Sequence, residues 1–193
     1  MRSAASCGQM ARSWDVNLSI SPVIKTICIM CLAESAVFRE NIPPDRFKAD
    51  VIVFEYLEMQ GKISGKKKQK LHLWRKRDIQ KLCEHQAHRN GIRVSRVSAR
   101  NTSRLACDGS GAVVRNPENH SLCIFRTGKQ YNCDLSAAYN IGARYLIREL
   151  LKPLPETERS SLEAKVPAVK RRTSCVYADL RKLYVEVNNL KAA

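Results

Sequence analysis

The spacing of apolar and polar residues predicts alternating helices and strands in the first half of the chain. Apolar positions recur at helical spacing between residues 22 and 38, so one helix is expected there. Residues 49–55 are β-branched and apolar up to a terminal Glu55, which is typical of a short buried strand. A second helix with apolar positions over residues 71–87 should follow, and residues 92–95 alternate like a half-exposed strand.

The second half of the chain combines turn-forming residues with a long helix. Residues 101–130 are rich in turn formers, and Asp108–Gly111 and Thr127–Lys129 are expected to form hairpin turns. A long helix should begin near Asp134, because apolar residues then recur at helical spacing as far as Leu150.

These elements predict one mixed α/β domain with attached segments. Residues 1–48 form a poorly defined N-terminal segment with one helix, and residues 49–152 form the main domain. Residues 101–130 are an insertion within that domain, and residues 153–193 are expected to be a peripheral C-terminal tail.

Charge narrows the class of partner. The chain has 193 residues, a formal net charge of +16 and a sequence pI near 9.8. Polyanions relieve the self-repulsion of such a charge, and nucleic acid is the commonest polyanion. We find no lipidation signal, no signal peptide and no apolar run long enough to span a bilayer, so we expect a cytoplasmic protein without a membrane partner. The eight cysteines are then expected to be thiols or metal ligands rather than disulfides.

Two carboxylates stand where catalytic acids could lie. Glu55 ends an apolar strand, which is either the exposed end of that strand or a site where a sheet presents ligands. Asp134 begins the long helix and could be its N-cap or a metal ligand. Cleavage of a phosphodiester by two metals needs carboxylates on separate elements that hold ions about 3.5–4 Å apart, and this pair would suit that arrangement.

Four ordered segments carry a resemblance to a known family; they are Asp50–Leu57, Leu71–Lys76, Asn101–Arg104 and Tyr131–Arg144. Together they resemble insertion-sequence OrfB proteins of the TnpB type, which are transposase-family, RNA-guided DNA nucleases related to the compact type V CRISPR effectors. The resemblance covers roughly residues 49–167. It implies an RNase H-like (RuvC-like) mixed sheet, Mg²⁺ or Mn²⁺ as cofactor, and DNA and a guide RNA as partners.

The resemblance also implies roles for single residues. Glu55 matches the second catalytic acid of the family, Asp134 matches the third, and Asn140 falls on the polar position of the following helix. The first catalytic Asp has no matching motif; Asp15 is the nearest candidate, but it lacks the Gly that usually follows and lies close to Glu55. We therefore expect an N-terminally truncated fold and an incomplete nuclease domain.

The insertion departs from the zinc ribbon that the family typically carries at this position. That ribbon uses two Cys-x-x-Cys pairs, because four soft ligands complete a tetrahedral site. Here Cys107, Cys123 and Cys133 have no paired spacing, so a degenerate ribbon-like hairpin without structural Zn²⁺ is expected, with Cys107 and Cys123 as the ligands if zinc binds. The pair Cys28 and Cys31 has the spacing, but we interpret it as buried thiols on an apolar helix face.

A basic stretch runs through three expected elements between Lys62 and Arg104. A solvated lysine loop is the usual explanation of such a run, but its continuity over a loop, a helix and a strand favours a face that binds phosphates. The candidate nucleic-acid-binding residues on it are Lys66, Lys67, Lys68, Lys70, Trp74, Arg75, Lys76, Arg77, Arg93 and Arg104.

Three functional hypotheses follow from the sequence. The first is a metal-dependent DNA endonuclease domain of a transposition protein, with Glu55 and Asp134 as metal ligands. The second is a non-catalytic, nucleic-acid-binding remnant of such a protein. The third is a part of an assembly in which a second polypeptide supplies the missing strand and its Asp.

Overall fold

The computed structural model describes residues 27–29, 50–56 and 76–192, and the expectations for other residues lie outside it. These elements fall into two compact units, Met1–Ser95 and Arg96–Ala193, each of which is described by itself.

The first unit contains one strand in a segment for which the sequence pattern predicted a helix. Strand β1 (Ile27–Ile29) runs parallel to β2 (Val51–Tyr56), with Ile27 opposite Val51. The helix predicted over residues 22–38 is therefore wrong at Ile27–Ile29. The reason is that a short apolar run fits a helix and a buried strand equally well until a partner strand is known.

Strand β2 and helix α3 (Lys76–Arg89) form the core of the first unit, and strand β3 (Arg93–Ser98) follows them. The sheet order is β1-β2-β3, and the Arg93 amide donates to the Asp50 carbonyl at 3.1 Å, so β2 and β3 begin side by side. The first four residues of β2 are buried, as predicted, and Ile52 and Phe54 lie in one apolar cluster with residues of α3. Helix α3 ends just before Asn90 and Gly91, and Gly91 adopts a φ of 67° that glycine tolerates without strain.

The second unit begins with the insertion, which is made of short antiparallel strands. Strands β4 (Val114–Arg115), β5 (Leu122–Ile124) and β6 (Gln130–Asn132) form one sheet in that order. An isolated bridge between Leu105 and Ala112 closes the first predicted turn, and β5 pairs with β6 across the second. Both predicted hairpin turns are confirmed.

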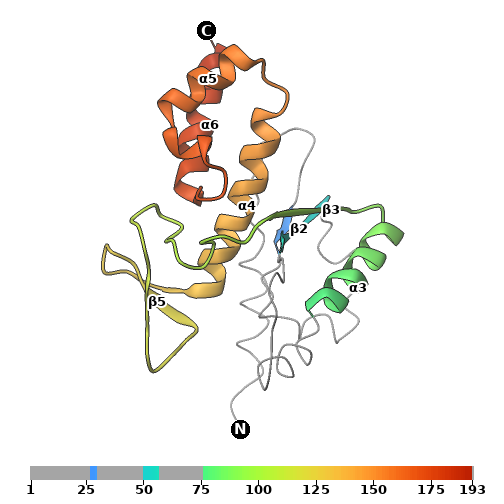
Figure 1. Ribbon diagram of the computed structural model, residues 1–193, viewed down its shortest axis with the longest axis vertical. Coiled ribbons are helices and arrows are strands. Elements are labelled where there is room, and N and C mark those ends of the chain that lie inside the picture. Colours follow the sequence, from blue (N-terminus) through green and yellow to red (C-terminus); the bar gives the residue numbers. More distant parts are fainter. Residues whose placement is uncertain (1–26, 30–49, 57–75, 193) are drawn as a thin grey trace, which may run out of the picture. The chain divides into compact units, whose positions relative to one another are not determined.

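Helix α4 (Cys133–Leu151) is the centre of the second unit and is buried almost all round over residues 140–147. Beside it lie α5 (Glu156–Lys165), the 3₁₀ helix η4 (Pro167–Lys170) and α6 (Tyr177–Ala192), as Figure 1 shows. The long helix near Asp134 was predicted from the sequence.

The prediction that residues 153–193 form a peripheral tail is wrong. Their apolar side chains Leu162, Val169, Leu180 and Leu183 are fully buried, and α6 packs on α4. Leu180, Leu183 and Val187 follow a helical spacing that the strongly basic run before them obscured. Apolar side chains of α5, η4 and α6 therefore complete the core of the second unit.

The side chain of Asn132 caps the N-terminus of helix α4. The Asn132 side-chain oxygen accepts from the amides of Asp134 and Leu135, both at 2.9 Å. Loss of an N-cap costs about 1 kcal/mol. We expect Asn132→Ala to lower the free energy of unfolding by that amount in a denaturant titration, and Asn132→Asp to retain the wild-type value. Equal losses in both variants would contradict the capping role.

Candidate functional site

Four polar residues spaced four apart form a stripe on α4: Ser136, Asn140, Arg144 and Arg148. Side chains at this spacing lie on one face of a helix. The first three are at most 3% exposed, which is costly for polar groups unless they are hydrogen-bonded. We call this set the α4 stripe.

Asn140 is the most connected residue of the α4 stripe. Its side-chain nitrogen donates to the carbonyls of Thr102 and Leu105 at 2.9 and 2.8 Å, and its oxygen accepts from the Tyr177 amide at 3.1 Å. One buried side chain therefore joins the start of the insertion and the start of α6 to the middle of α4. These hydrogen bonds explain why a polar residue, Asn140, occupies this buried position of α4, for which the resemblance implied no role.

The other members of the α4 stripe also bind backbone groups. Ser136 Oγ accepts from the Cys107 amide at 3.2 Å. The Arg144 guanidinium donates from Nε to the Cys175 carbonyl at 3.1 Å and from Nη1 to the Ser98 carbonyl at 2.6 Å. The α4 stripe thus fixes the insertion and the C-terminal helices against α4 through backbone atoms, which leaves the surface side chains of these segments free to differ.

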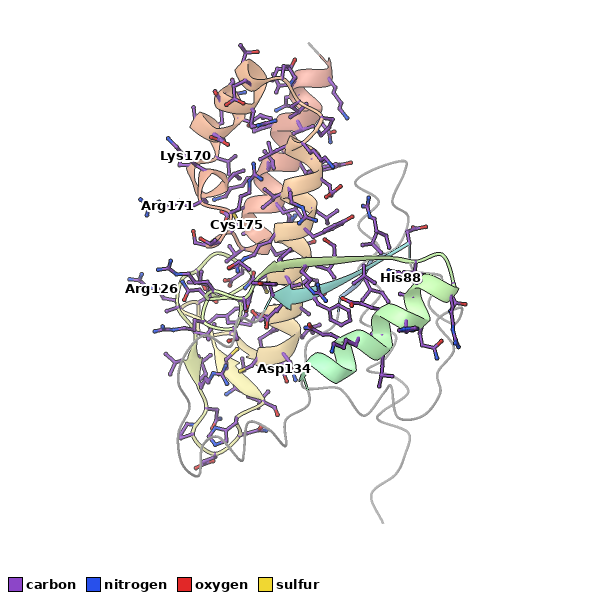
Figure 2. All side chains as sticks on the ribbon, turned by 45° about the vertical axis from the view of Figure 1, so that its right-hand side comes forward. His88, Arg126, Asp134, Lys170, Arg171 and Cys175 are labelled. Atoms are coloured by element: carbon purple, nitrogen blue, oxygen red, sulfur yellow. The ribbon has the colours of Figure 1, made fainter. Side chains whose placement is uncertain are left out.

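Asp134 lies in the first turn of α4, and Figure 2 shows it at the N-terminal end of the helix. The alternative that Asp134 is the N-cap is wrong, because Asn132 holds that position. The Asp134 side chain is half-buried, and within the described part of the chain no donor or cation pairs with its carboxylate.

Glu55 belongs to the first unit and is half-buried near the end of β2. Its backbone carbonyl accepts from Gln80 Nε2 at 3.2 Å, which ties the end of β2 to α3. Glu55 and Asp134 are therefore each held by an element of their own unit. Across residues 27–29, 50–56 and 76–192 no three His, Cys, Asp or Glu side chains are grouped so that they could hold a metal, and Asp15 is outside these ranges.

Two thiols of the insertion and one at the start of α4 lie in one apolar cluster. Cys107, Cys123 and Cys133 are buried with Ala106 and Phe125, and tyrosine rings pack around them. Burial raises the pKa of Cys107, and burial and the nearby Cys133 thiol raise the pKa of Cys123 to about 12. A closed zinc site wants four ligands, whereas this cluster supplies three thiols, so it does not fit such a site.

The structure places only some of the predicted nucleic-acid-binding residues. Arg93 and Arg104 are exposed. Lys76 and Arg77 lie in the first turn of α3, and the others (Lys66, Lys67, Lys68, Lys70, Trp74 and Arg75) lie outside the described residues.

Further basic residues, not selected from the sequence, are exposed on the second unit. Figure 2 shows Arg126, Lys170 and Arg171 pointing outward on the same side of that unit. Arg126 lies in the β5–β6 turn, and the other two lie at the end of η4. The run at residues 170–172 was visible in the sequence, but only the packing of the helices around it shows that it is held on a folded surface.

Comparison with known proteins identifies one part of the chain. Residues 77–141 match the Cas12f1-like TNB domain. This family is of the TnpB/Cas12 type, so the resemblance to TnpB-type proteins is confirmed. No curated protein and no solved structure gives a match.

The Cas12f1-like TNB match contains the insertion, the three thiols, Asp134 and Asn140, and it begins after Glu55. It therefore covers part of what the α4 stripe holds together: the Thr102 and Leu105 carbonyls, which accept from Asn140, and the first half of α4. A family of this type implies nucleic-acid partners. Among the described helices, none is long and apolar enough to cross a bilayer.

Removal of the Asn140 side chain should destabilise the second unit strongly. Asn140→Leu leaves two carbonyls and one amide without partners, and each buried unsatisfied group costs about 1–3 kcal/mol. We expect a loss of about 3 kcal/mol or more in the free energy of unfolding. The matched control is Asn188→Leu on exposed α6 surface, which should change stability by less than about 0.5 kcal/mol. A loss below that limit in Asn140→Leu would refute the structural role.

Metal removal tests the thiol cluster. Because apolar and aromatic packing surrounds the thiols, we expect the melting temperature to be unchanged by EDTA and the zinc content of the purified protein to stay well below one per chain. A drop in melting temperature on chelation, restored by Zn²⁺, would contradict this. Cys123→Val serves as the control, since an apolar side chain of similar size should be tolerated by such a cluster.

Proposed function

We propose that this chain provides a nuclease domain of the TnpB/Cas12f type that acts on DNA within a transposition protein. The match of residues 77–141 to the Cas12f1-like TNB domain carries this proposal. The carboxylate of Asp134 in the first turn of α4 supports it, because Asn132 and not Asp134 caps the helix. The net charge of +16 supports a polyanionic partner. An RNase H-like fold remains part of the proposal.

Glu55 and Asp134 would be the residues that hold the catalytic metal. Carboxylate oxygens are the ligands that Mg²⁺ prefers, and it is often bound through one or two of them with water and substrate phosphates. The metal, when bound, would activate water and stabilise the leaving oxygen. The chain itself would contribute the two carboxylates on separate, rigid elements: β2 is tied to α3 by Gln80, and α4 is fixed by Asn132 and the α4 stripe. Exposed arginines such as Arg93 and Arg104 would hold the backbone phosphates of DNA or of a guide RNA.

A second candidate is a non-catalytic nucleic-acid-binding protein, favoured because no motif of the sequence matches the family's first catalytic Asp. Such a protein would retain the basic surfaces and the hydrogen-bonded core. A further version of the proposal is that another polypeptide supplies the missing acid. In each of these proposals the protein binds nucleic acid in the cytoplasm.

The deciding experiment is a cleavage assay on labelled single- and double-stranded DNA, with Mg²⁺ or Mn²⁺ against EDTA. We expect metal-dependent cutting that Glu55→Gln and Asp134→Asn each reduce by more than about a hundredfold, because each removes one metal ligand without changing side-chain shape. Glu118→Gln, an exposed carboxylate in the β4–β5 connection, is the control and should cut like the wild type.

The other outcomes separate the remaining candidates. Salt-sensitive binding without cutting would establish the non-catalytic function. Cutting that appears only on addition of a second polypeptide would support the assembly. Cutting that survives both substitutions would show that the active site lies elsewhere in the chain.

A further inference from the structure

A pocket of about 390 Å³ lies at the C-terminal end of α4 in the second unit. It is lined by Arg148, Glu149, Lys152, Arg159 and Arg172. Arg148 is 14 residues along α4 from Asp134, which corresponds to about 21 Å of helix, so the pocket is distinct from that carboxylate. Four of the five lining side chains are cationic, and none is aromatic or apolar.

Capping of α4 alone does not explain this set of cations. Arg148 and Lys152 lie at the C-terminal end of α4, where the helix dipole favours positive charge. Arg159, however, comes from α5, and Arg172 follows η4. Their convergence on one pocket brings like charges together from three elements, which is unfavourable unless an anion is bound there.

Ion pairs within the second unit compensate only part of this charge. Arg148 pairs with Glu149 at 3.2 Å, and Arg159 pairs with Glu156 at 3.2 Å. Among the residues that the structure describes, no carboxylate lies within 4.0 Å of the Lys152 or Arg172 side chain. These two exposed cations are therefore the ones available to a ligand.

Rigid backbone holds the cations in place. Arg159 Nη2 donates to the Leu154 carbonyl at 3.2 Å, and the Lys152 amide donates to the Arg148 carbonyl at 3.1 Å. The segment before Arg172 is anchored by Val169, which is fully buried. A site on such elements binds its ligand with little loss of conformational entropy.

We propose that this pocket binds the phosphates of a nucleic-acid backbone, independently of base sequence. The lining has cations but no exposed aromatic ring, because the Tyr145 ring, whose centroid lies 5.2 Å from the Arg148 guanidinium, is fully buried. Cations alone contact phosphates, whereas a free nucleotide or an unpaired base is generally held by stacking on an exposed ring as well. The choice of nucleic acid over free phosphate rests on the proposed function; the phosphate chemistry rests on the pocket itself. The pocket would extend the phosphate-binding surface to the C-terminal helices.

The test measures binding of the whole chain to a labelled single-stranded oligonucleotide by fluorescence anisotropy, in EDTA and over a series of salt concentrations. For the double variant Lys152→Gln/Arg172→Gln we expect a roughly tenfold loss of affinity and a fall of about 1.4 in the salt slope, because two phosphate contacts to a single strand are lost. Glu149→Gln should instead bind more tightly, since it removes the one negative charge of the lining. Opposite effects of these variants cannot arise from a general loss of folding.

The control is Arg181→Gln/Lys182→Gln, which makes the same change in net charge on exposed α6 surface. Equal weakening by the two double variants would overturn the proposal, as would weaker binding by Glu149→Gln. Competition with inorganic phosphate and with ATP distinguishes the sources: binding of these alone, lost in the pocket variant, would assign the pocket to free phosphates. Wild-type protein that binds none of these probes would overturn it. Because EDTA is present throughout, a protein that never cuts DNA can still pass or fail this test.

Discussion

The buried amide of Asn140 is the interaction on which the second unit depends. It satisfies two carbonyls at the start of the insertion and the amide of Tyr177 at the start of α6. These groups come from segments that are 35 to 38 residues away along the chain, and no regular secondary structure would pair them. Without this side chain, three buried polar groups would have to lose water without gaining a partner.

Hydrogen bonds to buried backbone groups also stabilise the insertion, which lacks the two Cys-x-x-Cys pairs of a zinc ribbon. Cys107 is held at its amide by Ser136 and at its carbonyl by the Ala178 amide at 3.0 Å. Gly109 allows the close approach, since a Cβ there would lie 3.1 Å from the Ala178 side chain. Around the thiols, rings such as Phe125 and Tyr131, whose centroids are 5.4 Å apart, fill the space. Backbone hydrogen bonds and apolar packing therefore hold this part of the insertion in place.

Helix α4 also connects structure to the proposed chemistry. Asp134 lies in its first turn and does not cap the helix, because Asn132 holds the N-cap position. Arg148 and Lys152 at its C-terminal end line the cationic pocket. Between these ends the α4 stripe faces backbone groups, and most of the remaining residues are apolar and buried. One helix therefore carries a candidate metal ligand, the hydrogen bonds of the core and a phosphate-binding surface, on successive turns.

The sequence by itself determined the local elements and the family. Period and turn chemistry located β2, α3, both hairpin turns and α4, because these depend on residues that are neighbours in the chain. The motif around Asp134 indicated a TnpB-type protein, which the match over residues 77–141 confirms. The sequence could not decide that Ile27–Ile29 is a strand, since its apolar run needed β2 as a partner. Nor could it show that Asn140 and Arg144 are buried, that apolar side chains of α5, η4 and α6 complete the core, or that Arg148, Arg159 and Arg172 share a pocket. Those facts depend on which distant backbone groups and charges meet, and only tertiary packing fixes that.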